Sequence, residues 1–197
     1  GSAPITGMFV NFFSGLASGA GIVISNHYGA KDGAKLRDAV QTTYTVMLCL
    51  SAVITLLGVY LTPLMLRLMK TPADVFPQAE VYLKIYFWGV SGLLMYNAGA
   101  GILRAVGDSR RPLHILTFCT LLNIVLDYIF VKPLAMGVAG AAAATIISQF
   151  VSAFMVLGIL ALTEGEYRVQ PLKRHICTAE LSKIVKIGLP TAIQMAI

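Results

Sequence analysis

Residues 112–131, which read PLHILTFCTLLNIVLDYIFV, decide the fold. This stretch is 20 residues long and carries one formal charge, the carboxylate of Asp127. A helix of about 20 apolar residues spans the hydrocarbon core of a bilayer. An acidic side chain inside such a helix costs about 2.5 to 3.5 kcal/mol on insertion scales, so it normally faces a cavity or a polar partner. The stretch therefore predicts a membrane-spanning helix with an ion or proton site at Asp127.

Long uncharged runs recur along the whole chain. Of the 197 residues, 57% are hydrophobic and 12% are charged, whereas a typical soluble domain has about 25% charged residues. The runs 1–30, 39–66, 85–103 and 133–163 contain no Asp, Glu, Lys or Arg. None of them alternates with a period of two, which argues against an outer-membrane barrel. We therefore predict an all-α fold, a polytopic bundle of transmembrane helices.

We expect five complete spans and the beginning of a sixth. The complete spans cover about 5–28, 39–66, 80–103, 112–131 and 137–162. The longest hydrophilic segment, 163–180, is predicted to be a cytoplasmic linker, and 181–197 to open a further helix that is kinked at Pro190. Gly15 and Gly19 in the first span are spaced to let another helix approach closely. Because the chain starts and stops at or inside a span, we expect it to be a piece of a longer protein.

The basic residues gather on one side of the predicted membrane. Alternating the loops across the bilayer places 11 of them on one side and four on the other. The larger set is Lys31, Lys35, Arg37, Arg104, Arg110, Arg111, Arg168, Lys173, Arg174, Lys183 and Lys186. Because cytoplasmic loops carry an excess of Lys and Arg, this side is predicted to be cytoplasmic. We expect a multi-pass protein of the cell membrane, and the net charge of +6 requires no nucleic-acid partner.

Three polar side chains are predicted to meet near Asp127. Asn123 lies one helical turn before Asp127 and shares its face. Thr145 lies on the next span, and because a short loop joins the two spans, Asn123 and Thr145 should lie about equally deep, roughly 12 Å from the outer end. A carboxylate, an amide oxygen and a hydroxyl suit a hard cation. The alternative is that these groups only bond to neighbouring helices.

Other candidates carry less information. Thr120 extends the same stripe by one turn and is a possible cavity-lining residue. Asn97 lies in a glycine-rich segment, where it either lines a cavity or bonds a backbone carbonyl. His27, His114 and His175 stand at span ends and in the linker, which is typical of interfacial anchors. The aromatic residues near the outer end of the third span, Tyr82, Tyr86, Phe87 and Trp88, are typical of an interfacial belt.

Motifs of soluble enzymes and of cofactor sites are not found in the sequence. It contains no Walker loop, nucleophile elbow, HExxH or dinucleotide fingerprint. We therefore expect neither an enzyme nor a bound cofactor.

Several segments resemble, in order, the motifs of the multidrug and toxic compound extrusion (MATE) transporters. The sequence NHYGAKD at 26–32 is similar to the turn after the family's second helix, with Asn-His in place of its usual start. The sequence GILRAVGDSRRP at 101–112 resembles the turn between helices four and five. Residues 123–128 (NIVLDY) and 137–140 (GVAG) follow as in helices five and six, and IGLP at 187–190 resembles the start of helix seven.

This resemblance implies most of one six-helix lobe of a twelve-helix antiporter. Residues 1–162 would be helices 2–6 of the N-terminal lobe, 163–180 the inter-lobe linker and 181–197 the start of helix 7. In the family's DinF-like branch the cation site aligns with Asp127, Asn123 and Thr145, and a further Asp lies on helix 1. The partners implied are the lipid bilayer, amphipathic small-molecule substrates, and the rest of the transporter, helix 1 and helices 7–12.

The function implied is a secondary antiporter that exports amphipathic or cationic drugs and toxic compounds, driven by Na⁺ or H⁺. Asp127 would exchange the coupling ion, and Asn123 and Thr145 would supply neutral oxygens to a monovalent cation. One alternative is a flippase of the same superfamily that moves lipid-linked sugars, for which a cavity lined with several arginines is expected. The other is a non-transporting subunit of a membrane assembly.

Overall fold

The computed structural model describes residues 3–173 and 175–196, and side chains for residues 11–173 and 175–195. The described part is built from six helices and contains no strand, so the predicted all-α fold class is confirmed. The helices are α1 (Ala3–Gly29), α2 (Gly33–Leu68), α3 (Phe76–Ala105), α4 (Arg110–Val131), α5 (Gly137–Leu162) and α6 (Thr178–Ala196).

The helices extend beyond the uncharged runs. The expected span 39–66 lies inside α2, which has 36 residues and is therefore about 54 Å long. Such a helix exceeds the roughly 30 Å hydrocarbon core and must tilt or project. α2 begins at Gly33 because Asp32 caps it, with its carboxylate accepting a hydrogen bond of 3.2 Å from the Lys35 backbone N–H. An apolar run thus predicts the part in the membrane, and the cap sets the end of the helix.

The linker is shorter than expected because α6 starts at Thr178 rather than at 181. Glu180 lies in the first turn of α6, where a negative charge favours the positive end of the helix dipole. Segment 163–177 therefore connects α5 to α6. Pro190 lies inside α6, and the residues on both sides of it remain helical.

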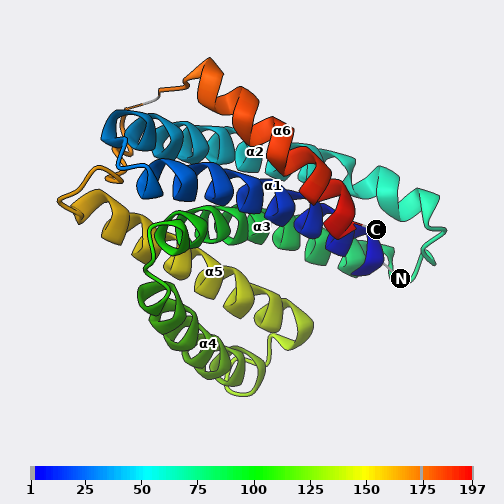
Figure 1. The fold of residues 1–197 in the computed structure, drawn as a ribbon. Coiled ribbons are helices and arrows are strands. Elements are labelled where there is room, and N and C mark those ends of the chain that lie inside the picture. Colours follow the sequence, from blue (N-terminus) through cyan, green and yellow to red (C-terminus); the bar gives the residue numbers. More distant parts are fainter. Residues whose placement is uncertain (1–2, 174, 197) are drawn as a thin grey trace.

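The helices form a layered bundle (Figure 1). The first three helices, α1, α2 and α3, lie side by side, and α6 lies against α1 over much of its length. α4 and α5 form a hairpin on the other side of α3, and α5 is the member of the hairpin that packs against it. The main core lies between α1, α2, α3 and α5, around fully buried residues that include Ile24, Val40, Ile102 and Val156.

Small residues let α1 and α6 come into backbone contact. Gly15 faces Ala192, and Gly19 faces Gly188. A Cβ atom added to Gly19 would overlap the Cα atom of Gly188, so neither helix has room for a larger side chain there. The close approach expected from the spacing of Gly15 and Gly19 is present, and the helix that uses it is α6.

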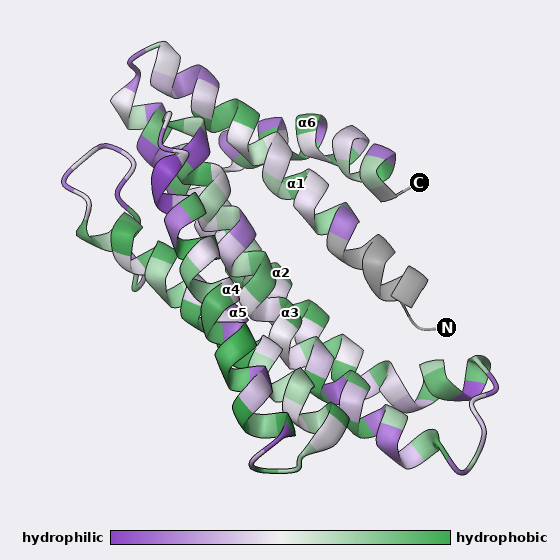
Figure 2. Ribbon diagram, turned by 90° about the horizontal axis from the view of Figure 1, so that it is seen from below, coloured by the Kyte–Doolittle hydropathy of each residue, from purple (hydrophilic) through white to green (hydrophobic). Residues whose placement is uncertain are grey.

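Much apolar surface remains on the outside of the bundle. Three helices, α2, α4 and α5, are long and apolar enough to cross a membrane, judged by the length and composition of the described residues. Hydrophobic residues cover most of the middle of α4 and α5, and hydrophilic residues gather at the helix ends and the connecting segments (Figure 2). Exposed apolar faces that extend along whole helices are typical of contact with lipid or with another part of the protein.

The aromatic residues of α3 do not form one lipid-facing belt. Trp88 is 55% exposed, whereas Phe87 is 5% exposed and belongs to a core cluster with Phe13 and Val90. The interpretation of all four aromatic residues as interfacial is therefore wrong for Phe87. Consecutive positions on a helix point about 100° apart, so neighbouring aromatic residues cannot all face lipid.

Candidate functional site

Asp127 lies on a helix that contacts few others. α4 packs mainly against α5, and its buried residues are Pro112, Ile115 and Cys119. Asp127 lies in the C-terminal half of α4 and is partly buried. The carboxylate thus lies in the hairpin of α4 and α5 and not in the centre of the bundle.

Asp127 and Thr145 line the same pocket between α4, α5 and α3. This pocket has a volume of about 220 Å³. Its lining residues are Tyr82, Tyr86, Asp127, Val138, Ala141, Ala142, Thr145, Ile146 and Gln149. The tight hairpin turn brings the two helices together, and its backbone is closed by a 3.0 Å hydrogen bond from the Met136 N–H to the Phe130 carbonyl. The structure thus brings together two of the three residues expected at the site.

The polar atoms at this place are incompletely satisfied. Oδ1 of Asp127 is shielded from solvent and has no hydrogen-bond partner within the described residues, and the same holds for Nδ2 of Asn123. Asn123 lies one turn before Asp127 but does not line the pocket. A half-turn of its amide would exchange the nitrogen and oxygen positions. Native proteins leave few buried polar atoms unpaired, so two on one helix face indicate a place where a ligand or another polar group binds.

Thr145 is exposed on α5, and its hydroxyl donates a 3.0 Å hydrogen bond to the Ala141 carbonyl. Since the hydroxyl proton points at the helix backbone, the lone pairs of the hydroxyl oxygen remain available to coordinate a cation. Within the described residues, no three His, Cys, Asp or Glu side chains form a cluster that could hold a metal ion. One carboxylate with neutral oxygens suits a monovalent ion better than a divalent one, because divalent sites usually recruit more negative charge.

Sequence reasoning missed three polar residues of this pocket, Tyr82, Tyr86 and Gln149. Tyr82 and Tyr86 are four residues apart on α3, and their rings stack with a centroid distance of 6.5 Å. Gln149 follows Thr145 by one turn on α5 and lies against Gly89, where an added Cβ would come 2.6 Å from its Oε1. The spacing of Thr145 and Gln149 was a usable signal for one polar face.

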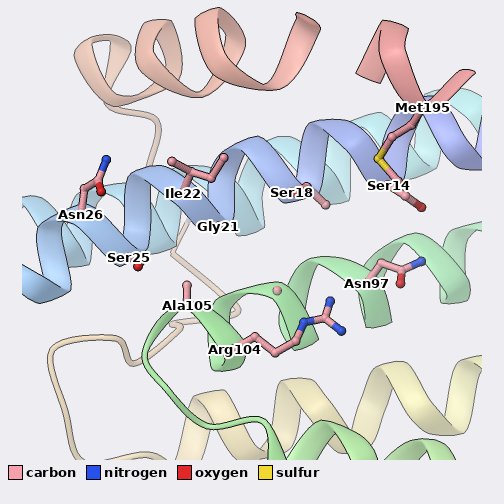
Figure 3. A pocket seen from close by; sticks show the side chains of 12 residues that line it. Ser14, Ser18, Gly21, Ile22, Ser25, Asn26, Asn97, Arg104, Ala105 and Met195 are labelled. Carbon is pink, nitrogen blue, oxygen red and sulfur yellow. The ribbon is translucent and has the colours of Figure 1, made fainter. Parts of the chain in front are cut away.

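Asn97 lines a second pocket, of about 460 Å³, between α1 and α3. Figure 3 shows Ser14 and Ser18 on α1 above Asn97 and Arg104 on α3, with Met195 reaching in from α6. Of the two options for Asn97, the cavity-lining one is what the structure shows. Thr120 is exposed on α4, its hydroxyl donates to the Leu116 carbonyl, and it lines neither pocket.

Residues 2–129 match the family model described as MatE. The chain belongs to the MatE family. Family members are multi-pass membrane proteins, which agrees with the three apolar helices long enough to span a bilayer. The family assignment confirms the resemblance drawn from the motifs, and the match does not specify the DinF-like branch.

Several curated relatives of this MatE chain are named as probable multidrug resistance proteins. The "Probable multidrug resistance protein YpnP" of Bacillus subtilis is 32% identical over 196 residues, which is 100% of this chain and 44% of that protein. The "Probable multidrug resistance protein NorM" of Thermotoga maritima is 30% identical over 184 residues, 89% of this chain and 39% of that protein. Proteins of this family are transporters and not enzymes, as expected from the sequence.

Solved structures of MATE transporters share the fold. An inward-facing multidrug resistance MATE family transporter matches with a TM-score of 0.88 and 27% identity, over 99% of this chain and 44% of that one. An outward-facing conformation of a MATE family transporter matches equally well, with a TM-score of 0.88 and 26% identity over 98% of this chain and 43% of that one. The MatE chain thus spans less than half the length of the relatives it matches.

Proposed function

We propose that the full-length transporter is a secondary antiporter that exports amphipathic compounds, and that Asp127 binds its coupling ion, Na⁺ or H⁺. The observation that carries this proposal is the partnerless, buried Oδ1 of Asp127 in a pocket that also contains the Thr145 hydroxyl. A carboxylate of this kind can take up either a proton or a cation and release it when the site opens to the other side.

The roles of the neighbouring groups follow from their chemistry. Thr145 supplies a neutral oxygen from the facing helix. Asn123, one turn before Asp127 on α4 and outside the pocket lining, supplies an amide oxygen. Gln149 extends the oxygen set on α5, and the rings of Tyr82 and Tyr86 screen the pocket from the membrane. Such an arrangement balances one positive charge with one carboxylate and leaves the pocket neutral when it is loaded.

The larger pocket between α1 and α3 is proposed to contact the exported compound. Its volume of about 460 Å³ lies in the range of small-molecule sites. The hydroxyls of Ser14 and Ser18 and the amide of Asn97 offer hydrogen bonds, and the Met195 side chain offers an adaptable apolar contact. Several curated relatives are named as probable multidrug resistance proteins, and these names support export of such compounds.

The flippase alternative is less well supported. A flippase of this kind is expected to have a cavity lined with several arginines. The described lining of the pocket between α1 and α3 contains one arginine, Arg104, at the end of α3. A single arginine does not provide the multiple contacts that a pyrophosphate-linked sugar requires.

Equilibrium binding of radioactive Na⁺ to the purified full-length transporter, and proton release measured in weakly buffered solution, test the proposed ion site. Asp127→Asn is expected to lower the affinity for the ion that binds by at least about tenfold, which corresponds to about 1.4 kcal/mol. Asp74→Asn makes the same chemical change at an exposed position and is the matched control. Unchanged binding of both ions by Asp127→Asn would exclude Asp127 as the coupling site.

A further inference from the structure

A basic pocket lies at the linker end of the bundle, remote from Asp127. Its volume is about 210 Å³. Its lining residues are Arg37, Asp38, Gln41, Arg168, Gln170, Lys173 and His175, from the first turns of α2 and from the linker. Hydrophilic residues concentrate at this end of the molecule (Figure 2). The distribution of basic residues predicts that this end faces the cytoplasm.

Positive charge in this pocket exceeds negative charge. Arg37, Arg168 and Lys173 are cationic, and Asp38 is the single carboxylate in the lining. Asp38 lies 3.5 Å from Nε2 of His175, so its carboxylate already has a neighbour on one side of the pocket. Nε of Arg168 donates a 2.9 Å hydrogen bond to the Ala161 carbonyl, and the two terminal nitrogens of Arg168 form no ion pair among the described residues. Arg37 and Lys173 also form no ion pair among these residues. Three cations around one small volume favour a bound anion.

The pocket is rigidly built, although its cations are exposed. Gln41 is 6% exposed, and its Nε2 donates hydrogen bonds to the carbonyls of Gln170 and Lys173. Its Oε1 accepts a 3.0 Å hydrogen bond from the Gln170 N–H, so this one side chain holds the linker at both Gln170 and Lys173. Val169 is completely buried beside α5 and anchors the same loop. The linker therefore holds Arg168 and Lys173 opposite Arg37 as part of the fold.

An apolar pocket adjoins the basic one. It is lined by Ala161, Arg168, Val169, Gln170, Pro171, Leu172 and Lys173, and so shares three residues with the basic pocket. The Leu172 side chain is fully exposed at this place. A cationic pocket that borders an apolar one, at the end of apolar helices, matches the division of a phospholipid into a phosphate head and an apolar body.

From this arrangement we infer that the linker and the start of α2 form a binding site for the phosphate group of an anionic phospholipid in the cytoplasmic leaflet. Arg37, Arg168 and Lys173 bind the phosphate oxygens, and guanidinium groups suit them because they donate paired hydrogen bonds. Leu172 and Pro171 contact the glycerol and the first acyl carbons. The site ties the inter-lobe linker to the membrane surface independently of the transport site at Asp127.

The test uses the purified, delipidated full-length transporter and native mass spectrometry to count bound phosphatidylglycerol or phosphatidylcholine. Wild-type protein is expected to retain phosphatidylglycerol preferentially. Because a basic residue near an anionic lipid surface contributes about a fivefold change in affinity, the double variant Arg37→Gln/Arg168→Gln should bind it about 25-fold more weakly. Arg110→Gln removes the same charge from an exposed position on α4 and is the matched control. Because Arg110 does not line the pocket and an exposed charge outside it is screened, this variant should change the affinity by less than about twofold.

Added inorganic phosphate distinguishes the source of the phosphate. Competition between inorganic phosphate and phosphatidylglycerol, lost in the double variant, supports recognition of the phosphate group. Variant-sensitive binding of inorganic phosphate without any variant-sensitive binding of phosphatidylglycerol overturns the assignment to lipid. Equal weakening by Arg110→Gln and by the double variant, or no weakening by either, shows diffuse surface charge and overturns the site.

Discussion

His27 at the end of α1 and Glu180 in the first turn of α6 lie 2.8 Å apart, Nε2 to Oε2, although 153 residues separate them in the sequence. Lys183 also donates to Glu180, over 2.8 Å. Glu180 is 3% exposed, so this network is almost entirely shielded at the carboxylate. Together with the backbone contact between Gly19 and Gly188, it fixes the start of α6 against α1.

The pH dependence of stability should report this network. Burial favours the neutral form of Glu180, but hydrogen bonds from Lys183 and His27 outweigh it and hold the pKa of Glu180 below its ordinary value of 4.5. A lowered pKa in the folded state stabilises the fold above the unfolded-state pKa, and that stabilisation is lost as the pH falls through the folded-state pKa. Glu180→Gln should therefore lower the free energy of unfolding near neutral pH by about 1.5 to 3 kcal/mol.

Chemical unfolding of the purified transporter between pH 7 and pH 4 measures this difference. The difference in the free energy of unfolding between wild type and Glu180→Gln should have its full size near neutral pH and should become smaller at the acid end of the range. Glu164→Gln, an exposed carboxylate in the linker, is the control and should leave stability nearly unchanged. Equal free energies of unfolding for wild type and Glu180→Gln near neutral pH would show that the charge on Glu180 is not what stabilises the contact.

The contact between α1 and α6 predicts an intolerance of side chains at Gly19. Gly19→Ala should destabilise the fold by about 1 to 3 kcal/mol, because the new Cβ overlaps the backbone of Gly188. Gly29→Ala is the matched control, since a Cβ there meets nothing within 4 Å. Thermal unfolding in detergent measures both variants. Similar melting temperatures for Gly19→Ala and wild type would mean that α6 does not pack on α1 in this way.

How much of this follows from the sequence depends on the range of each interaction. The helices could be located because a long apolar run favours a helix wherever it occurs, and the hairpin of α4 and α5 could be predicted because its loop is short. Three of the described helices are long and apolar enough to cross a membrane, and the full set of five spans stays a prediction. The meeting of Asp127 and Thr145 in one pocket follows from the helix positions and the short loop alone. Whether the pair binds an ion remains a prediction.

The features that the sequence does not predict depend on contacts between distant parts of the chain or on the direction of a single side chain. The contact of His27 with Glu180 and the clamp of Gln41 on the linker join segments more than a hundred residues apart, and no local periodicity records them. For this reason the sequence predicts only an interfacial anchor at His27. Phe87 was misplaced because its neighbours in sequence face a different direction from its own side chain.

The clamp formed by Gln41 predicts a local effect. Gln41→Ala removes three hydrogen bonds to the linker, each worth about 1 kcal/mol, so segment 168–173 should exchange its amide hydrogens faster while the rest of α2 stays protected. Hydrogen exchange followed by mass spectrometry measures this. Gln78→Ala, at an exposed position, should leave the linker unchanged. Unchanged exchange in the Gln41 variant would show that other contacts hold the linker.

The Thr145 hydroxyl should tune the ion site. Thr145→Val keeps the shape of the side chain but removes the oxygen, and it should weaken binding of the coupling cation by about fivefold, the equivalent of about 1 kcal/mol. Thr145→Ser keeps the oxygen and should restore most of the affinity. Equal affinities for the Val and Ser variants would exclude a direct role for the oxygen. If H⁺ is the coupling ion, the same comparison is made on proton release.

Drug efflux from proteoliposomes that contain the full-length transporter, measured with and without an imposed gradient of Na⁺ or of pH, tests the central claim most directly. Wild-type efflux should accelerate with one of the two gradients by at least about tenfold, the effect of about 1.4 kcal/mol. Asp127→Asn should leave efflux slow and insensitive to both gradients, and Asp74→Asn should behave as wild type. Gradient-driven efflux at the wild-type rate in Asp127→Asn would contradict the assignment of Asp127 as the coupling carboxylate.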